Sequence, residues 1–347
     1  MASNGAPRPR HRADPPDVQR LAAVPDVQPL AAPAVQRLAP VRPTVPAPLV
    51  DRVEDPRVTV VVASRNRRTE LLHSLARHRA SVILLDNASD DGTADAVRDR
   101  HPHVDVVELP RNVGAYARTL GVARARAPYV AFADDDSWWA PGSLAAAARV
   151  LDEHPEVAVV GARILVGPAE RLDPVCDVMA ASPLAGPPGL PYPRLLGFVA
   201  CAAMVRTETF LDAGGFDGIV RFPGEEERLA WDLAAKGRTI AYVDDLVVHH
   251  HPSPLRHSPD ARVRALTRSS VLTALLRLPW RRAGRRGAEA LGSGRATRSG
   301  LLAALPDVPR ALRHRAVLPA DVLADLDLLA RPTTRPVHST PREGEAA

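Results

Sequence analysis

The strongest constraint on the fold of this chain is a regular alternation of strand-like and helix-like segments between residues 57 and 133. Residues 57–63 are a continuous β-branched run of the kind that forms a strand buried on both faces. Helical patterns and further apolar runs then alternate along residues 71–76, 81–86, 91–100, 104–109, 115–126 and 129–133. This alternation predicts an α/β fold with a Rossmann-like, mostly parallel sheet flanked by helices.

The pattern becomes less regular after residue 137. It predicts helices at 143–154, 208–213 and 226–236, and strands at 157–165, 195–205, 239–243 and 246–250. From residue 252 onward the chain is rich in arginine and helical in pattern. We expect this helical extension to lie apart from the main hydrophobic core.

The ends of the chain differ in composition from its middle. The 35 prolines are concentrated at the two ends and in residues 184–193, and residues 1–55 contain no aromatic side chain. We therefore expect disordered tails at residues 1–55 and 331–347, a folded domain at residues 56–252, and the helical extension at residues 253–330.

Charge and cysteine content limit the classes of partner and compartment. The net charge of +5 permits an anionic partner, but the basic residues are scattered and no nucleic-acid-binding motif occurs, so we expect no nucleic-acid partner. The two cysteines have no metal-site spacing, and the N-terminus lacks the apolar segment of a secretory signal. These features favour a cytoplasmic protein.

Three adjacent carboxylates, Asp134, Asp135 and Asp136, directly follow the apolar run at residues 129–133. Carboxylates this close together repel one another, which favours a bound cation at the end of the strand. A solvated turn that starts the next helix is the alternative. A second acid cluster at residues 225–227 and a histidine run at residues 249–251 follow later segments. We interpret the three clusters as parts of one metal-dependent site.

Six short motifs together resemble the family 2 glycosyltransferases of the GT-A fold. They are residues 60–67, 85–93, 111–114, 132–136, 214–217 and 224–226, and their order and spacing match the family over residues 57 to 252. The resemblance implies an enzyme that transfers a sugar from a nucleotide-sugar donor to an acceptor hydroxyl with inversion at the anomeric carbon. It also implies a nucleotide-binding half at residues 56–136 and an acceptor half at residues 137–252.

The resemblance assigns contacts with the nucleotide sugar to residues at the carboxyl ends of the first strands. These residues are Ser64, Arg65, Asp86, Asn112, Gly114 and Asp135. For residues 89–91, a local turn that caps the next helix is an equal alternative. The family usually has tyrosine at the position of Arg65, so a guanidinium is expected to stack on the base in its place.

The implied cofactor is Mn²⁺ or Mg²⁺. Asp134 and Asp136 match the outer carboxylates of the family's Asp-X-Asp motif, and a divalent cation held there neutralises the diphosphate leaving group. Adjacent strand residues point to opposite faces, so the three histidines at 249–251 cannot all be buried. We expect His250 or His251 to complete the metal site.

Inverting transfer needs a carboxylate that takes the proton of the acceptor hydroxyl. Glu226 matches the acid that usually serves as this base in the family, and Glu225 is the next candidate. The family more often has aspartate at the positions of Glu226 and Arg228. Acids that only favour a helix N-terminus are the alternative.

Aromatic residues suggest further contacts. Trp138 is expected to pack on the donor or acceptor sugar, although core packing is the better expectation for one of the adjacent pair Trp138 and Trp139. Residues 260–286 resemble either an interfacial membrane anchor or an ordinary amphipathic helix. The expected acceptor is a glycan, a lipid-linked molecule or a small molecule, and the first of the two readings of 260–286 places the protein at the inner face of the plasma membrane.

Two other functions remain as alternatives. A sugar nucleotidyltransferase shares the early sheet and the acidic site, but it needs a glycine-rich loop after the first strand, and residues 64–68 contain no glycine. A catalytically inactive relative that binds a sugar or a partner is the other alternative. It rests on the departures from the family at Ala63, Arg65, Thr119 and Arg228.

Overall fold

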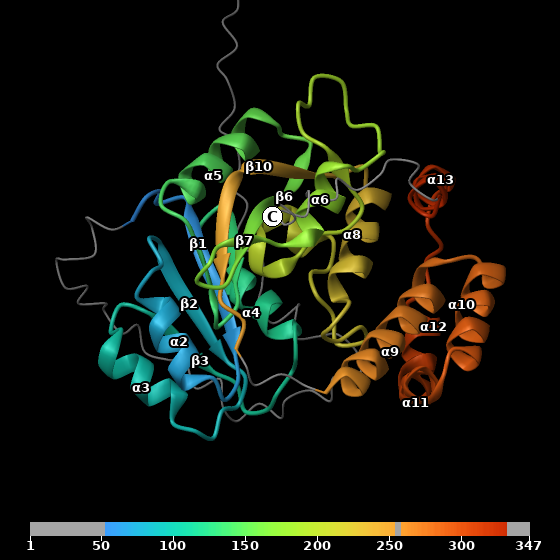
Figure 1. Cartoon of the computed structure of the whole chain (residues 1–347), viewed down its shortest axis with the longest axis horizontal. Helices are drawn as coiled ribbons and strands as arrows, with labels where there is room; N and C mark the ends of the chain where they lie inside the picture. The colour runs from blue at the N-terminus through green and yellow to red at the C-terminus, as the bar shows by residue number, and fades with distance from the viewer. Residues whose placement is uncertain (1–52, 254–257, 332–347) are drawn as a thin grey trace, which may run out of the picture. The chain divides into compact units, whose positions relative to one another are not determined.

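The computed structural model describes residues 53–253 and 258–331 of the 347-residue chain (Figure 1). Most of the two expected tails, residues 1–52 and 332–347, lies outside the described residues. The described part has a mixed, mostly parallel sheet flanked by helices, followed by a helical C-terminal region. The α/β fold class expected from the sequence is therefore confirmed.

A ten-stranded sheet has the strand order β3-β2-β1-β4-β9-β6-β10-β5, with the short strands β7 and β8 paired to β6 and β10. Its first part is parallel: β1 (Val58–Ser64) lies between β2 (Ser81–Asp86) and β4 (Tyr129–Ala133), and β3 (Asp105–Glu108) flanks β2. Because all four strands run in one direction, the polar residues that follow β1, β2 and β4 meet at one edge of the sheet.

The helices of this first part are α2 (Arg68–Leu75), α3 (Thr93–Arg100) and α4 (Tyr116–Arg124). Helix α4 packs very closely on the sheet at Gly121. A Cβ atom at this position would lie 2.5 Å from Cγ1 of Val61 and 2.7 Å from Cδ2 of Leu85. Only glycine allows this approach, and it fixes the preceding turn of α4 near the carboxyl ends of the strands.

The second part of the sheet reverses direction at β9, which is antiparallel to both β4 and β6. Its elements are β5 (Ser137–Trp139), α5 (Ser143–Glu153), β6 (Val157–Val166), β7 (Arg171–Leu172), α6 (Pro174–Ala180), β8 (Arg194–Leu195), a 3₁₀ turn at Ala200–Ala202, β9 (Ala203–Arg206), α7 (Thr207–Asp212), α8 (Glu225–Ala235) and β10 (Thr239–His250).

Three expectations for this part need correction. The strand expected at 195–205 is divided between β8, the 3₁₀ turn and β9, because β8 and β9 pair with different strands. The two strands expected at 239–243 and 246–250 are one strand, β10, with an irregular register between Val243 and Val247. Ser137, a start signal for the next helix in the alternative reading of the acid run, instead begins β5, which pairs with β10.

The C-terminal region contains the helices α9 (Pro259–Arg277), α10 (Trp280–Gly292), α11 (Arg295–Ala304), α12 (Val308–Arg313) and α13 (Ala320–Leu329), with a 3₁₀ turn at Leu305–Asp307 (Figure 1). A second hydrophobic cluster, which includes Leu272 and Ala311, also contains Ile219 and Val220 from the loop before α8. Leu278, Leu318 and Val322 belong to the main core. The expectation that the extension lies apart from that core is therefore wrong for these residues.

A partly buried ion pair also joins α8 to α9: Nη2 of Arg277 lies 3.0 Å from Oδ2 of Asp232. In the two described ranges, 53–253 and 258–331, no helix combines the length and the apolar composition needed to cross a bilayer.

Candidate active site

The first group of predicted site residues lies where β1, β2 and β4 end. Ser64 and Asp86 are register partners on adjacent strands, and Val62 is the partner of Ala133, the last residue before the acid run. The Ser64 hydroxyl donates a hydrogen bond of 3.0 Å to Oδ2 of Asp135. The structure thus brings the ends of the first and fourth strands into direct contact.

Asp86 is buried and holds a local turn. Its Oδ1 accepts hydrogen bonds from the backbone N–H of Ser89, at 3.1 Å, and from the Ser89 hydroxyl. Arg65 reaches across to the same turn, with Nε donating to the carbonyl of Ala88 at 3.3 Å. In this conformation both side chains hydrogen-bond within the turn at residues 86–89. Asp86 therefore takes part in the local turn that was the alternative role for residues 89–91.

Asn112 and Gly114 lie in the loop before α4. Oδ1 of Asn112 accepts from the Gly114 N–H at 2.8 Å, and Gly114 has a φ of 63°, which glycine adopts without strain. Asn87 ties this loop to β2, because its Oδ1 accepts from the Val113 N–H at 2.8 Å and its Nδ2 donates to the Gly114 carbonyl at 3.0 Å. Sequence reasoning did not assign this positioning role to Asn87.

The carboxylates of the acid run after β4 have different surroundings. Burial, together with the neighbouring charges of Asp134 and Asp136, raises the pKa of Asp135 to about 7. Burial also acts to raise the pKa of Asp136, but contacts with His250 and with the Ser253 N–H hold that pKa below its usual value. Oδ1 of Asp136 lies 3.4 Å from Nε2 of His250, and Oδ2 accepts from the Ser253 N–H at 3.1 Å.

Arg118 is a buried residue of the candidate site that sequence reasoning did not single out. Its buried guanidinium forms an ion pair with Asp134, and its Nη1 lies 3.4 Å from Oε1 of Glu225. Arg118 lies on the same helical face as the buried residues Gly121 and Val122, at spacings of three and four. An arginine on the apolar face of a helix is a signal that could have identified it.

The two candidate bases lie in the first turn of α8 and differ in exposure. Glu225 is fully buried, and its Oε2 has no hydrogen-bond partner among the residues that the structure describes. Glu226 is only half-buried. Burial raises the pKa of both carboxyls, and the charge of Arg118 opposes the rise in each case.

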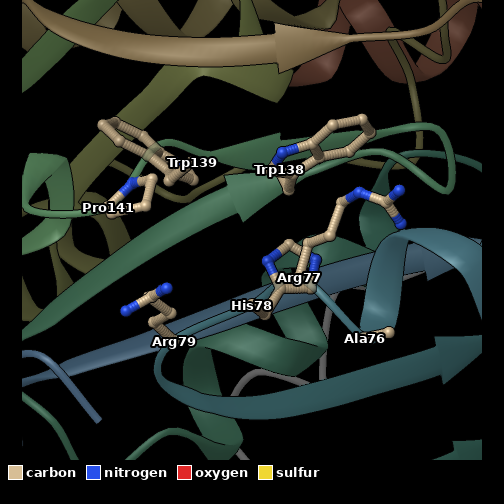
Figure 2. Close-up of a pocket in the computed structure, with 7 residues that line it drawn as sticks. All are labelled: Ala76, Arg77, His78, Arg79, Trp138, Trp139 and Pro141. Atoms are coloured by element: carbon tan, nitrogen blue, oxygen red, sulfur yellow. The ribbon is translucent and has the colours of Figure 1, made fainter. Parts of the chain in front are cut away.

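The Trp138 ring contacts two of the three histidines at residues 249–251. The Trp138 ring stacks on His249 with centroids 5.5 Å apart, lies 4.8 Å from the His251 ring, and has the guanidinium of Arg77 at 4.7 Å (Figure 2). His249 also lies 3.1 Å from a carboxylate oxygen of Glu170. By contrast, Trp139 is buried, and its Nε1–H donates to the Phe132 carbonyl at 3.0 Å, as expected for the core member of the pair.

The four predicted metal residues are not equivalent in this geometry. Asp136 and His250 lie together, whereas Asp134 is paired with Arg118 and the ring of His251 faces Trp138. Within residues 53–253 and 258–331 no group of three or more acidic, histidine or cysteine side chains is arranged around a common point. The Asp136 carboxylate still fits Mg²⁺ or Mn²⁺, since both ions favour carboxylate oxygens and Mg²⁺ is usually held by one or two carboxylates together with substrate phosphates.

Comparisons with known proteins show which family and which fold the chain resembles. Residues 59–212 match the family model described as Glycosyl transferase family 2. The N-acetylglucosaminyl-diphospho-decaprenol L-rhamnosyltransferase of Mycobacterium tuberculosis (strain ATCC 25618 / H37Rv) is 28% identical over 211 residues, which cover 51% of this chain and 69% of that protein.

Among solved structures, S. aureus TarS 1-349 aligns with a TM-score of 0.50 and 19% identity, over 77% of this chain and 82% of that one. A second S. aureus TarS structure gives a TM-score of 0.48 and 18% identity over 77% of this chain, which spans 50% of that one. At these identities the likeness to TarS 1-349 concerns the fold alone, and it confirms the expected GT-A architecture.

Proposed function

We propose that this chain, whose residues 59–212 match the glycosyltransferase family 2 model, transfers a sugar from a nucleotide-sugar donor to an acceptor hydroxyl with inversion, in a site that uses a divalent cation. One observation carries the proposal. Arg118 holds Asp134, from the acid run after β4, and Glu225, from the first turn of α8, in one buried ion-pair network. The acid run, which contains the proposed cation ligand Asp136, and the first turn of α8, which contains the proposed base Glu226, are therefore neighbours, as a direct displacement requires.

Glu226 is assigned as the general base. Its half-buried side chain is open to an acceptor, whereas Glu225 is fully buried and engaged by Arg118. A pKa raised by burial brings a carboxylate nearer to the working pH and makes it a better proton acceptor. Glu225 then acts as a positioning residue that fixes the start of α8 through Arg118.

The donor side is assigned to the ends of the first strands. Ser64 and Asp135 are joined by their hydrogen bond and offer a hydroxyl and a carboxylate at the strand ends, where α/β sheets bind nucleotides. Asp136 and His250 are assigned to the cation, with Mn²⁺ and Mg²⁺ as the candidates. When bound, the cation neutralises the charge that develops on the departing diphosphate.

The proposed acceptor is lipid-linked. The M. tuberculosis relative is named for a rhamnosyl transfer to a diphospho-decaprenol-linked sugar, and its identity of 28% over 51% of this chain supports an acceptor of the same class. Residues 260–286 would bring the site to a bilayer, because Trp280 is 62% exposed and Val263 and Leu266 are also exposed among arginines. These exposed apolar side chains support a peripheral position at the inner face of the membrane.

The inactive alternative is disfavoured by the structural roles of two unusual residues. The Thr119 hydroxyl donates to the Phe216 carbonyl at 2.9 Å and accepts from the Phe216 N–H at 2.8 Å. Nε of Arg228 lies 3.1 Å from Oδ2 of Asp217. These departures from the family stabilise the loop before α8 and leave Glu226 and Asp136 in place.

The direct test is thermal stabilisation of the metal-free protein by UDP-, GDP- and dTDP-sugars, with and without Mn²⁺. We expect one nucleotide class to raise the melting temperature only when the cation is present. At a hundredfold excess of the donor over its Kd, the added free energy of unfolding is about 2.7 kcal/mol. Asp136→Ala should lose this response, and Asp99→Ala, at an exposed aspartate of α3, should keep it. Equal stabilisation of the unaltered protein with and without cation would contradict metal dependence, and no response to any donor would contradict the proposed activity.

A further inference from the structure

The loop that leads into α8 is packed against the C-terminal helices, which lie outside the residues 59–212 that match the family model. Ile219 and Val220, in this loop, are both buried, and they share the second hydrophobic cluster with residues of α9, α10, α11 and α12. The carbonyl of Ile219 also accepts a hydrogen bond of 3.0 Å from Nη2 of Arg268, on α9. The C-terminal helices therefore fix the path of the chain toward α8, which carries the proposed base Glu226.

Ser269 of α9 lies against the residue at which α8 begins. It is only 2% exposed, and its hydroxyl donates a hydrogen bond of 2.7 Å to the Arg221 carbonyl in the loop. A Cβ atom placed on Gly224, the N-cap of α8, would lie 3.1 Å from Cβ of Ser269. Gly224 has a φ of 108°, which favours glycine. Both contacts hold the N-terminus of α8 in one position.

Arg286 of α10 holds the first turn of α8. Its Nη1 lies 3.3 Å from Oε1 of Glu227, which directly follows Glu226, and donates to the Ser270 hydroxyl on α9 at 2.9 Å. The three adjacent carboxylates of this turn, at residues 225–227, repel one another, so a guanidinium beside Glu227 offsets part of the repulsion. Arg286 thus ties the turn that carries Glu226 to both α9 and α10.

We propose that Ser269 and Arg286 are positioning residues for the general base, so that α9 and α10 are a working part of the active site. The inference rests on the function proposed above, which assigns proton transfer to Glu226. Both residues act through α8: Ser269 fixes its N-cap, and Arg286 fixes its first turn. A displaced base no longer meets the acceptor proton at hydrogen-bond distance, and a misplacement of about 1 Å can lower a rate about a hundredfold.

Hydrogen–deuterium exchange, followed by mass spectrometry, tests this coupling without any substrate. Ser269→Ala removes the hydroxyl that holds the Arg221 carbonyl, and Arg286→Gln removes the charge beside Glu227. Each change should speed the exchange of the backbone amides of residues 219–227 by roughly fivefold, as expected for the loss of one net hydrogen bond. Unchanged exchange of this segment in both variants would overturn the inference.

Two matched control variants remove similar contacts elsewhere in the C-terminal helices. Ser293→Ala deletes a hydroxyl that donates to the Glu289 carbonyl at 2.6 Å, and Arg298→Gln deletes a guanidinium whose Nε donates to the Leu291 carbonyl at 2.9 Å. Neither contact reaches α8, so the exchange of residues 219–227 should stay the same. Equally fast exchange in the control variants would mean a general loosening of the C-terminal helices and would also overturn the inference.

Turnover separates positioning of the base from general structural support. The probe is hydrolysis of the nucleotide sugar that stabilises the protein with Mn²⁺, with water in place of the acceptor. Ser269→Ala and Arg286→Gln should each lower kcat roughly tenfold and keep the stabilisation by donor and cation. In a Glu226→Gln background the same changes should cause no further loss, because they act through the base. Normal turnover in both variants, an equal loss in both backgrounds or a parallel loss of donor binding would overturn the inference.

Failure of the proposed function has a different signature. Near-normal hydrolysis by Glu226→Gln would place the base elsewhere, and no hydrolysis by the unaltered protein would contradict the transfer chemistry on which the inference rests. If Glu226→Gln is impaired while Ser269→Ala and Arg286→Gln are not, the proposed function stands and only the positioning role is wrong.

Discussion

The buried imidazole of His78 makes the stability of this protein depend on pH in a way that one substitution should remove. Burial holds the pKa of His78 at about 4, against an ordinary value of 6.5. Between these values the unfolded chain binds a proton that the folded chain does not, so stability is lost as the pH falls. At about 1.4 kcal/mol per pH unit, the loss due to His78 is about 2 kcal/mol at pH 5 and about 3 kcal/mol at pH 4.

Urea denaturation at pH 7.5 and pH 5 measures this contribution as a difference between variants. The free energy of unfolding of His78→Leu, relative to that of the unaltered protein, should rise by about 2 kcal/mol between the two pH values. His314→Gln, at an exposed histidine, controls for the loss of an imidazole as such. A difference that stays constant between pH 7.5 and pH 5 would show that His78 is hydrated or paired in the folded protein, contrary to the reasoning.

Two further predictions concern the candidate active site. Glu226→Gln should lower kcat by roughly 10² to 10⁴ with little change in donor affinity, because it keeps the shape of the base but not its proton affinity. Glu225→Gln should lower kcat much less. Near-normal turnover of Glu226→Gln with the true acceptor would place the base elsewhere. Arg118→Gln should reduce the free energy of unfolding by about 3–5 kcal/mol, since it leaves the buried Glu225 without its counter-charge. The exposed pair of Arg124 and Asp105 provides the control, and Arg124→Gln should cost less than about 1 kcal/mol; similar losses in both arginine variants would contradict the central role given to Arg118.

The sequence by itself determined the first part of the fold and the family. The strands at residues 58–64 and 129–133 follow from short apolar runs, and α4 follows from a helical repeat, because these signals lie within a few adjacent residues. The carboxyl ends of parallel strands meet at one edge, so the sequence also located Ser64, Asp86 and the acid run on a common edge of the sheet. Strand pairing could not be read in the same way after residue 137, where β8, β9 and β5 are too short to show a period of their own.

Only the tertiary structure decided which of these residues act together. Arg118 contacts Asp134, 16 positions away, and Glu225, 107 positions away, and no local pattern encodes such pairings. The same holds for the contacts of α9 and α10 with the start of α8, and for the residues of the helical extension that enter the main core. Burial also distinguishes Glu225 from Glu226, which are adjacent and identical in the sequence. Desolvation and ion pairing depend on every neighbour that folding brings near a charge, so the roles of these groups are set by packing between distant segments.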